Sequence, residues 1–210
     1  MKVGILALQG AFREHAEVFA ALGADVSLVR LPAHLGGVDA LAIPGGESTV
    51  IDKLLDSSGL REPITELVRE GCPTFATCAG LIVLAREVSD GLSSSHGGDR
   101  RPLGLLDCTV RRNGYGRQVD SFEAPLAISG MAGGPFPGVF IRAPIVERIG
   151  PGVEVLASHE DRPVLCRQGA IWAASFHPEL SGDLRVHERF LQCSGAEPES
   201  SARPNMRPQA

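Results

Sequence analysis

One cysteine in the sequence occupies a place where a thiol could act as a nucleophile. Cys78 lies in the stretch PTFATCAGLIVLA, residues 73–85, which has the pattern of a strand followed by a helix. The start of a helix lowers the pKa of a thiol, and a neighbouring imidazolium lowers it further. Ala79 and Gly80 leave the backbone N–H groups after the thiol uncrowded, so these groups could meet an oxyanion. We interpret Cys78 as a candidate nucleophile; the alternative is a small buried hydrophobic residue.

The other four cysteines are better explained as structural residues. Their number with Cys78 is odd, they are scattered, and no CxxC pair or histidine cluster accompanies them (Cys72, Cys108, Cys166 and Cys193). These features argue against a disulfide framework and against a structural zinc site. The opening residues, MKVGILALQG, have no signal-peptide cleavage pattern. We therefore expect a cytoplasmic protein with free thiols and no bound metal.

A thiolate needs a base, and six histidines compete for that role. Four of them are expected to be solvated, because they fall in a predicted amphipathic helix, in loops or near the chain end (His15, His34, His96 and His187). His159 and His177 both follow predicted strands and precede acidic residues. In FHPEL, Pro178 favours extended backbone at His177. Glu179, two residues later, then faces the same side of the chain as His177. In SHED the acid is adjacent and faces away, so we predict His177 as the base and Glu179 as its orienting carboxylate.

Strands and helices alternate over the first part of the chain. Apolar runs predict strands over 2–8, 25–30, 38–44 and 73–77, and helical periodicity predicts helices over 11–23, 48–59, 60–71 and 79–88. Gly23 is the expected residue just past the first helix, and Ser48 or Thr49 the expected N-cap of the second. From about Leu103 the pattern predicts successive strands, at 106–112, 117–122, 138–143, 153–158, 163–168 and 170–176, and a last helix over 182–192.

This alternation predicts a single α/β domain. A mostly parallel central sheet covered on both faces gives a three-layer sandwich over residues 1–193. Three chemistry-bearing stretches, PGGEST, TCAGL and SFHPEL, each follow a predicted strand, and ligands bind beyond the carboxyl ends of such strands. Residues 91–101 are Gly/Ser-rich and predicted to form a surface loop, and the Pro/Ser-rich residues 194–210 a disordered tail.

Composition excludes several classes of function. The chain has 210 residues, a net charge of -5 and no basic stripe, so nothing favours nucleic-acid binding. No apolar run approaches the roughly 18 residues that a membrane span needs. Neither a phosphate-binding G-x-x-x-x-G-K-[ST] loop nor a dinucleotide fingerprint is present, and no cofactor is expected.

The motifs together resemble a known family. TCAGL with FHPE is similar to the nucleophile and His-x-Glu pair of the triad-type (class I) glutamine amidotransferases. LALQGAFREH, PGGEST, RNGYGRQVDSFEA and FIRAP narrow the resemblance to the glutaminase subunits of pyridoxal 5′-phosphate synthase. The similarity runs from about residue 2 to residue 191. One departure is Ala76, where many members carry glycine; its methyl group is a mild change that tightens the turn at the nucleophile.

The resemblance implies a class I glutamine amidotransferase-like fold and the hydrolysis of L-glutamine to L-glutamate and ammonia by a Cys78/His177/Glu179 triad. It implies backbone N–H groups of Gly46 and Ala79 as the oxyanion hole. It also implies a glutamine site lined by Gly46, Glu47, Ser48, Arg112, Ile141 and Arg142. A guanidinium suits the substrate α-carboxylate and Glu47 suits the α-ammonium group. Because glycine tolerates either sign of φ, we expect the Gly45–Gly46 peptide to flip at little cost.

The resemblance further implies a partner. It names the barrel-shaped subunit of pyridoxal 5′-phosphate synthase, which would receive the ammonia in a hetero-oligomer, since this chain has no second catalytic cluster to use it. Two other interpretations stay open. One is an unrelated Cys-His hydrolase, such as a peptidase or deglycase, which gives no reason for GGEST or RNGYGRQVDSFEA. The other is a catalytically idle regulatory subunit, against which the complete Cys/His/Glu set argues.

Overall fold

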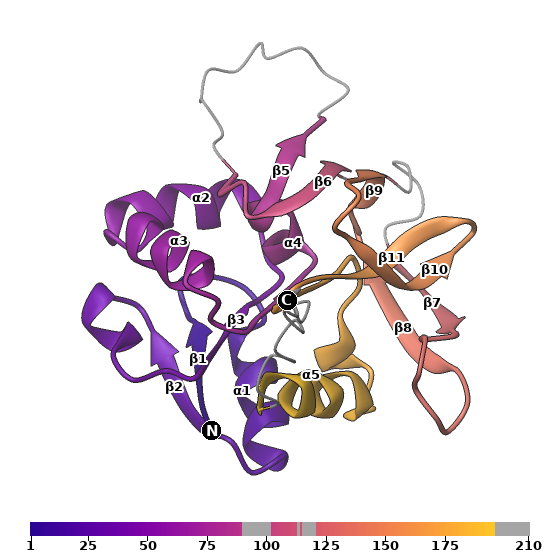
Figure 1. The fold of residues 1–210 in the computed structure, drawn as a ribbon, viewed down its shortest axis with the longest axis horizontal. Helices are drawn as coiled ribbons and strands as arrows, with labels where there is room; N and C mark the ends of the chain where they lie inside the picture. The colour runs from indigo at the N-terminus through magenta and orange to yellow at the C-terminus, as the bar shows by residue number, and fades with distance from the viewer. Residues whose placement is uncertain (90–101, 113, 115–120, 196–210) are drawn as a thin grey trace, which may run out of the picture.

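The computed structural model describes residues 1–89, 102–112, 114 and 121–195, and a seven-stranded sheet runs through its centre (Figure 1). The strand order is β10-β11-β12-β4-β3-β1-β2. Neighbours from β12 to β2 pair in parallel, while β10 and β11 add an antiparallel edge. The strands are β1 (Lys2–Leu6), β2 (Asp25–Val29), β3 (Ala40–Ile43), β4 (Thr74–Thr77), β10 (Glu154–His159), β11 (Arg162–Gln168) and β12 (Ile171–Ala174).

Helices and two small sheets cover both faces of this sheet, as Figure 1 shows. One face packs against α2 (Ser48–Ser57), α3 (Arg61–Arg69), α4 (Ala79–Leu84) and a sheet of β5 (Ala85–Val88), β6 (Leu106–Arg111) and β9 (Ile145–Ile149). The other packs against α1 (Phe12–Ala21), α5 (Arg185–Gly195) and the hairpin of β7 (Ser121–Leu126) and β8 (Phe136–Ile141). Short 3₁₀ turns are η1 (Pro32–Leu35) and η2 (Pro178–Leu180). The predicted three-layer α/β architecture is confirmed.

The central strands are buried on both sides, which explains their continuous apolar runs. All four residues of β3 are fully buried. Leu41 and Ile43 face the cluster under α2 and α4, whereas Ala40 and Ala42 face the cluster under α1 and α5. Ala76 lies in the first of these clusters and pairs with Ile43 and Ala173, so its methyl group is part of the core.

Several predicted elements differ from the observed ones. The helix expected over 79–88 ends at Leu84, and β5 follows because Ala85 is extended, with φ -54° and ψ 153°. β5 pairs with β6, not with the central sheet, and β9 was not predicted. The strands from β5 onward are divided among three sheets. The strand predicted over 117–122 falls mostly outside the described residues, as do the 91–101 loop and residues 196–210.

Helix ends show one prediction confirmed and one wrong. Gly23 follows α1 with φ +80°, the left-handed conformation expected of a residue past a helix C-terminus. The N-cap of α2 is Glu47, not Ser48 or Thr49. Its carboxylate accepts the backbone N–H groups of Thr49 at 3.2 Å and Val50 at 3.0 Å. A carboxylate at this position also complements the helix dipole.

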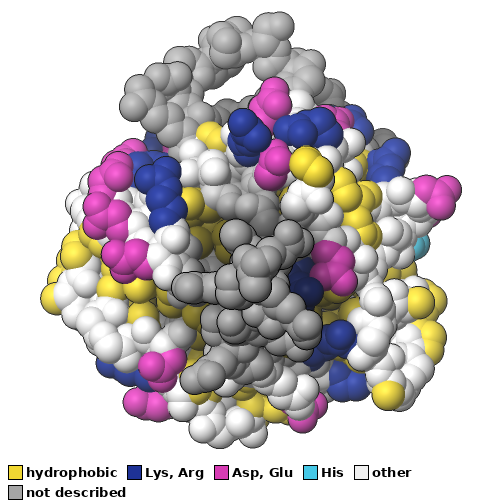
Figure 2. Space-filling view, in the orientation of Figure 1, with side chains coloured by type: hydrophobic (Ala, Val, Ile, Leu, Met, Phe, Trp, Pro, Cys, Tyr) yellow, Lys and Arg dark blue, Asp and Glu magenta, His cyan; other side chains and the backbone are white. Residues whose placement is uncertain are grey.

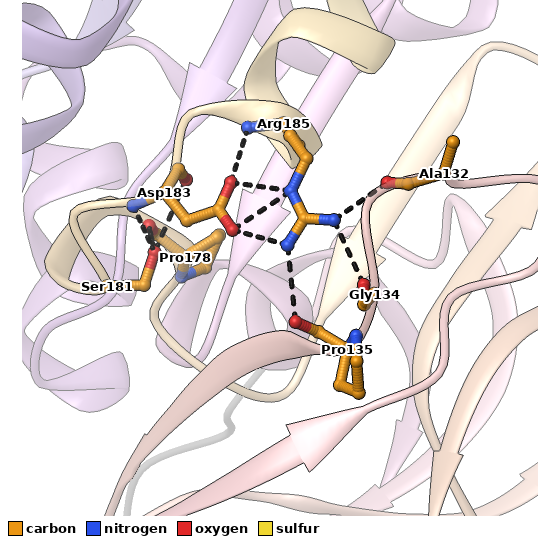
Figure 3. Close-up of polar contacts among 7 residues, drawn as sticks. All are labelled: Ala132, Gly134, Pro135, Pro178, Ser181, Asp183 and Arg185. Carbon is orange, nitrogen blue, oxygen red and sulfur yellow. Dashed lines mark hydrogen bonds and ion pairs between the residues drawn. The ribbon is translucent and has the colours of Figure 1, made fainter.

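The segment after β12 is clamped to the β7–β8 hairpin by one arginine (Figure 3). The Arg185 guanidinium contacts the Asp183 carboxylate, with Nη2 and Oδ2 2.6 Å apart. The same group donates to three backbone carbonyls of the connecting loop, those of Ala132 at 2.8 Å, Gly134 at 3.0 Å and Pro135 at 3.2 Å. Asp183 also accepts the backbone N–H of Arg185 at 3.0 Å, which delays the start of the last helix from the predicted 182 to 185.

On the face drawn in Figure 2, acidic and basic side chains are interspersed. A typical contact joins α2 and α3, where Arg61 bonds the carboxylates of Asp52 and Asp56. Among the described residues, no helix is both long and apolar enough to cross a membrane.

Candidate active site

Strand order brings Cys78 and His177 to the same edge of the sheet. β4 and β12 are parallel neighbours with Thr77 opposite Ala174, so the residues that follow them leave at adjacent points. Cys78 N–H donates to the Ala174 carbonyl at 2.8 Å, and His177 N–H donates to the Val139 carbonyl of β8 at 2.8 Å. The backbone of both residues is thus held by the sheet and its neighbouring hairpin.

Cys78 has a strained backbone at the turn from β4 into α4. Its φ of 47° and ψ of -104° lie in a region that non-glycine residues rarely adopt. Such strain costs on the order of 1–3 kcal/mol and persists where the surroundings enforce it. Gly80 permits the arrangement in a different way from the one expected. A Cβ there would lie 2.1 Å from the Ile43 carbonyl oxygen, so α4 can approach β3 this closely only with glycine.

His177 and Glu179 form a buried pair. His177 Nδ1 lies 2.7 Å from Glu179 Oε1, and each residue is 6% exposed. Burial alone would lower the pKa of His177, but its hydrogen bonds to Cys78 and Glu179 outweigh that effect and raise the pKa to about 10. The imidazole is therefore charged at neutral pH, as a thiolate–imidazolium pair requires. Burial likewise opposes ionisation of Glu179, yet the imidazoles of His15 and His177 hold its pKa below the usual range.

Gly45 packs against both members of the thiol–imidazole pair. A Cβ on this residue would lie 2.4 Å from His177 Cε1 and 3.1 Å from Cys78 Cβ. Its N–H donates to Thr77 Oγ1 at 3.0 Å, and its carbonyl accepts the N–H of Ala11 at 3.0 Å. The bond to Ala11 fixes the orientation of the Gly45–Gly46 peptide. A flip would break this bond, at a cost of about 1 kcal/mol beyond the glycine freedom that the sequence suggests.

The residues predicted to bind glutamine lie in two groups. Ile141 and Arg142 are beside Cys78: the Ile141 carbonyl oxygen is 3.9 Å from Cys78 Sγ, and Arg142, the next residue, has a φ of 43°. Ser48 and Arg112 line a small open hollow next to α4, and Arg112 Nη1 lies 3.1 Å from Thr49 Oγ1.

Two other predicted binding residues are held by the loop before α2. The Glu47 carboxylate is exposed and caps that helix, which leaves lone pairs free for an ammonium group. The Glu47 N–H donates to the Gln9 side-chain oxygen at 2.7 Å, and Gly46, just before it, packs against Gln9 and Gly10.

Sequence comparison identifies the family. The profile of the SNO glutamine amidotransferase family matches residues 5–194. The chain belongs to this family. It is 54% identical over 192 residues to the pyridoxal 5′-phosphate synthase subunit PdxT of Pelotomaculum thermopropionicum, covering 91% of this chain and 94% of the relative. It is 52% identical over 195 residues to the same-named subunit of Deinococcus radiodurans, covering 93% and 98%.

Solved structures agree on the fold. A crystal structure described as a glutamine amidotransferase is 49% identical, with a TM-score of 0.84, and covers 92% of this chain and 99% of that one. A protein described as a putative GMP synthase subunit from Thermoplasma acidophilum is only 16% identical, with a TM-score of 0.66 and coverage of 92% and 94%. The second likeness concerns the fold alone. The glutamine amidotransferase-like fold expected from the sequence is confirmed.

Two histidines of this amidotransferase were wrongly expected to be solvated. His15 and His187 are completely buried and lie 3.1 Å apart, Nδ1 to Nε2, behind Glu179. The signal was present in the sequence. His15 stands on the apolar stripe of α1 three positions after Phe12 and four before Phe19, and His187 lies three before Phe190 on the buried face of α5.

The remaining candidates lie away from the site. His159 ends β10 and packs against Phe122 and Phe140, with ring centroids 5.5 and 5.7 Å away. Cys108 and Cys166 are buried, which raises the pKa of each thiol to about 12, and burial raises that of Cys72 to about 11. Cys193 is exposed, and His96 falls outside the described residues. Within the described ranges, no group of three or more His, Cys, Asp and Glu side chains is arranged to hold a metal ion.

Proposed function

We propose that this chain is the glutaminase subunit of pyridoxal 5′-phosphate synthase, with Cys78 as nucleophile, His177 as general acid and base, and Glu179 as the carboxylate that orients it. The observation that carries the proposal is the buried chain of contacts from Cys78 through His177 to Glu179. The relatives that bear the name of this synthase subunit support the same conclusion.

The reaction follows from this geometry. The Cys78 thiolate attacks the side-chain amide carbon of glutamine, and backbone N–H groups of Ala79 and Gly46 stabilise the oxyanion, each worth about 3 kcal/mol. The His177 imidazolium gives its proton to the leaving nitrogen, and ammonia departs from the thioester. His177, now neutral, takes a proton from water as it attacks the thioester, which releases glutamate and restores the thiolate–imidazolium pair.

Substrate binding is assigned to the residues around this edge. A guanidinium, from Arg112 or Arg142, pairs with the glutamine α-carboxylate, and Glu47 with the α-ammonium group. Ser48 and the Ile141 backbone complete the site. The position of Ile141 next to Cys78 Sγ supports this assignment, as does the hollow shared by Ser48 and Arg112.

The proposed partner is the barrel-shaped synthase subunit, docked over the carboxyl ends of the strands. Three large apolar side chains are exposed just beyond such ends: Leu31 after β2, Val50 at the start of α2, and Leu180 next to Glu179, which are 53%, 39% and 41% exposed. A contact there would shield leaving ammonia from water and deliver it to the partner. We assign the complex to the cytoplasm.

A glutaminase assay with active-site labelling tests the catalytic proposal. A glutamine-derived electrophile should modify Cys78 alone, as read by peptide mapping, and Cys78→Ala should abolish both labelling and ammonia release while leaving the thermal unfolding profile unchanged. Labelling of another cysteine would favour an unrelated hydrolase. An absence of both labelling and ammonia release, even with the synthase subunit present, would favour an idle regulatory subunit.

The partner proposal has a separate test. Ammonia release at saturating glutamine should be weak for the chain alone and rise substantially with the synthase subunit. If docking selects a peptide orientation populated at about 1% in the free chain, the rise is roughly 100-fold. Equal kcat with and without the subunit would refute the coupling and leave the glutaminase assignment intact.

A further inference from the structure

A second histidine touches the orienting carboxylate from the side opposite His177. His15 Nε2 lies 3.4 Å from Glu179 Oε2, and its side chain and that of Glu179 are both fully buried. The same nitrogen lies 3.0 Å from Thr77 Oγ1, one residue before the nucleophile. On its other side, His15 Nδ1 lies 3.1 Å from His187 Nε2. The proposed reaction uses neither histidine.

Burial decides the charge of this pair. Burial lowers the pKa of His15, against the opposing effects of the Glu179 and Glu14 carboxylates, and the nearby His177 imidazolium lowers it further. Burial lowers the pKa of His187 well below its usual value, and His15 adds to that effect. Both rings are therefore neutral at neutral pH. Each has one N–H group to donate.

The available partners decide which nitrogen carries each proton. His187 Nδ1 has no hydrogen-bond partner, so a proton there would be a buried, unsatisfied donor. Its proton accordingly belongs on Nε2, which donates to His15 Nδ1. The His15 proton then belongs on Nε2, which donates to Thr77 Oγ1 at 3.0 Å and lies 3.4 Å from Glu179 Oε2. The opposite arrangement would face a bare ring nitrogen toward Glu179 Oε2, a buried carboxylate oxygen that has no hydrogen-bond partner.

We propose that His15 is a positioning residue for the triad: its Nε2–H, fixed by Thr77 Oγ1, lies 3.4 Å from the outer oxygen of the Glu179 carboxylate, while His177 contacts the inner oxygen at 2.7 Å. A carboxylate flanked by an imidazole at each oxygen keeps one orientation toward the imidazolium that it stabilises. This inference rests on the proposed catalytic roles of Cys78, His177 and Glu179.

Thr77 links His15 to the backbone at Gly45, next to the proposed oxyanion-hole residue Gly46. Thr77 Oγ1 accepts the Gly45 N–H at 3.0 Å while it contacts His15 Nε2. One buried imidazole on α1 therefore touches both the carboxylate behind the base and the hydroxyl that holds Gly45 against Cys78 and His177. A change at His15 should disturb the thiol–imidazole pair even though His15 contacts neither the thiol nor the substrate.

The test uses alkylation of Cys78 by iodoacetamide against pH, because this readout needs neither glutamine nor the partner subunit. His15→Leu removes the polar neighbour that positions Glu179, so the carboxylate no longer keeps its contact with His177; the imidazolium is then weaker and the thiolate forms only at higher pH. We expect the midpoint of alkylation against pH to move up by about one pH unit, so that alkylation is about tenfold slower than in the wild type at any pH below both midpoints. His15→Gln places an amide N–H near the former Nε2 and should restore most of the wild-type profile.

Matched variants separate positioning from loss of packing. Phe19→Leu perturbs the same face of α1 without touching Glu179 and should leave the midpoint unchanged. In a Glu179→Gln background, His15→Leu should cause no further shift, since the carboxylate through which it acts is gone. If His15→Leu does not fold, His15→Asn replaces it, because its shorter amide reaches only the Nδ1 side; Asn should shift the midpoint and Gln should not.

Three outcomes overturn the inference. These are an unshifted midpoint in His15→Leu, the same midpoint in the Gln and Asn variants, and an undiminished shift in the Glu179→Gln background. A wild-type Cys78 that alkylates no faster at pH 6 than Cys193 would instead refute the proposed nucleophile itself, so the two failures are distinguishable.

Discussion

The segment that follows β12 is held by two polar clusters of opposite character. The buried cluster joins Glu179 to His177 and His15 with few contacts, and the side chains of Glu179 and His15 are fully buried. The surface cluster, Asp183 and Arg185, makes several hydrogen bonds, but its side chains are 20% and 26% exposed. We therefore expect the cluster with fewer hydrogen bonds to have the larger effect on activity.

Solvent explains the difference. When a contact of Arg185 is lost, water replaces it, so each bond contributes little net stability. When a contact of Glu179 is lost, a buried charge or donor is left without a partner, which is far more costly. The surface cluster holds the 132–135 loop against the segment after β12, while the buried cluster orients the Glu179 carboxylate toward His177.

The largest effect should come from removing the charge of the buried cluster. Glu179→Gln keeps the size of the side chain but takes away the negative charge that stabilises the imidazolium, and its amide favours the wrong tautomer of His177. We expect kcat for ammonia release to fall on the order of 10³-fold. His159→Ala, the matched histidine outside the site, should stay within a few-fold of wild type. Comparable losses in His159→Ala and His177→Ala would show that the base is wrongly assigned.

The next effect should come from crowding the same pair. Gly45→Ala places a methyl group against the His177 ring and the Cys78 Cβ, and the ring must move to accommodate it. A displacement of about 1 Å is enough to reduce kcat on the order of 10²-fold. Gly152→Ala, where a Cβ would meet nothing within 4 Å, is the control. Wild-type kinetics in Gly45→Ala would mean that the pair is not held as tightly as its contacts indicate.

Because His15 and His187 are buried and neutral, the free energy of unfolding should fall at acid pH. His15 and His187 are neutral in the folded protein and bind protons below about pH 6.5 when unfolded, so the unfolded state binds more protons and stability falls as pH falls. Each histidine contributes a loss of about 1.4 kcal/mol per pH unit below 6.5 until its folded pKa is reached. Denaturant unfolding at pH 7.5 and 5.5 measures this slope. His187→Phe should show a shallower slope than the wild type, and an equal slope would contradict the assignment.

The smallest effect should come from the surface cluster. Arg185→Ala removes the clamp on the 132–135 loop, yet water can take over its contacts. We expect ammonia release within about threefold of wild type, because Glu179 is held by other residues. The Tm should fall slightly, and the difference in Tm from the wild type should be smaller at high salt, which screens the ion pair. A loss of activity similar to that of Glu179→Gln would contradict the claim that the surface cluster matters less for activity than the buried one.

The sequence predicted those features that depend on pattern or on local spacing. The apolar runs located the central strands, and the His-Pro-Glu spacing located the carboxylate that meets His177. The sequence did not place β5, because only tertiary pairing with β6 turns 85–88 from helix to strand. The cap of α2 was missed because the carboxylate of Glu47 reaches its own helix. The burial of His15 and His187 does not follow from the sequence, because a polar residue on an apolar stripe is buried favourably only when another element supplies a buried partner, as these two histidines do for each other.

The place of β12 in the strand order has a consequence for the newly synthesised chain. β12 lies between β4 and β11, so His177, the proposed base, is synthesised about one hundred residues after Cys78. At usual rates of translation that delay is about 5 to 20 s, during which Cys78 has no imidazolium beside it. The thiol should therefore be no more reactive than an ordinary cysteine until the last strand is inserted. Iodoacetamide labelling of ribosome-bound chains that end before residue 171 would measure this, and fast labelling of Cys78 in such chains would contradict it.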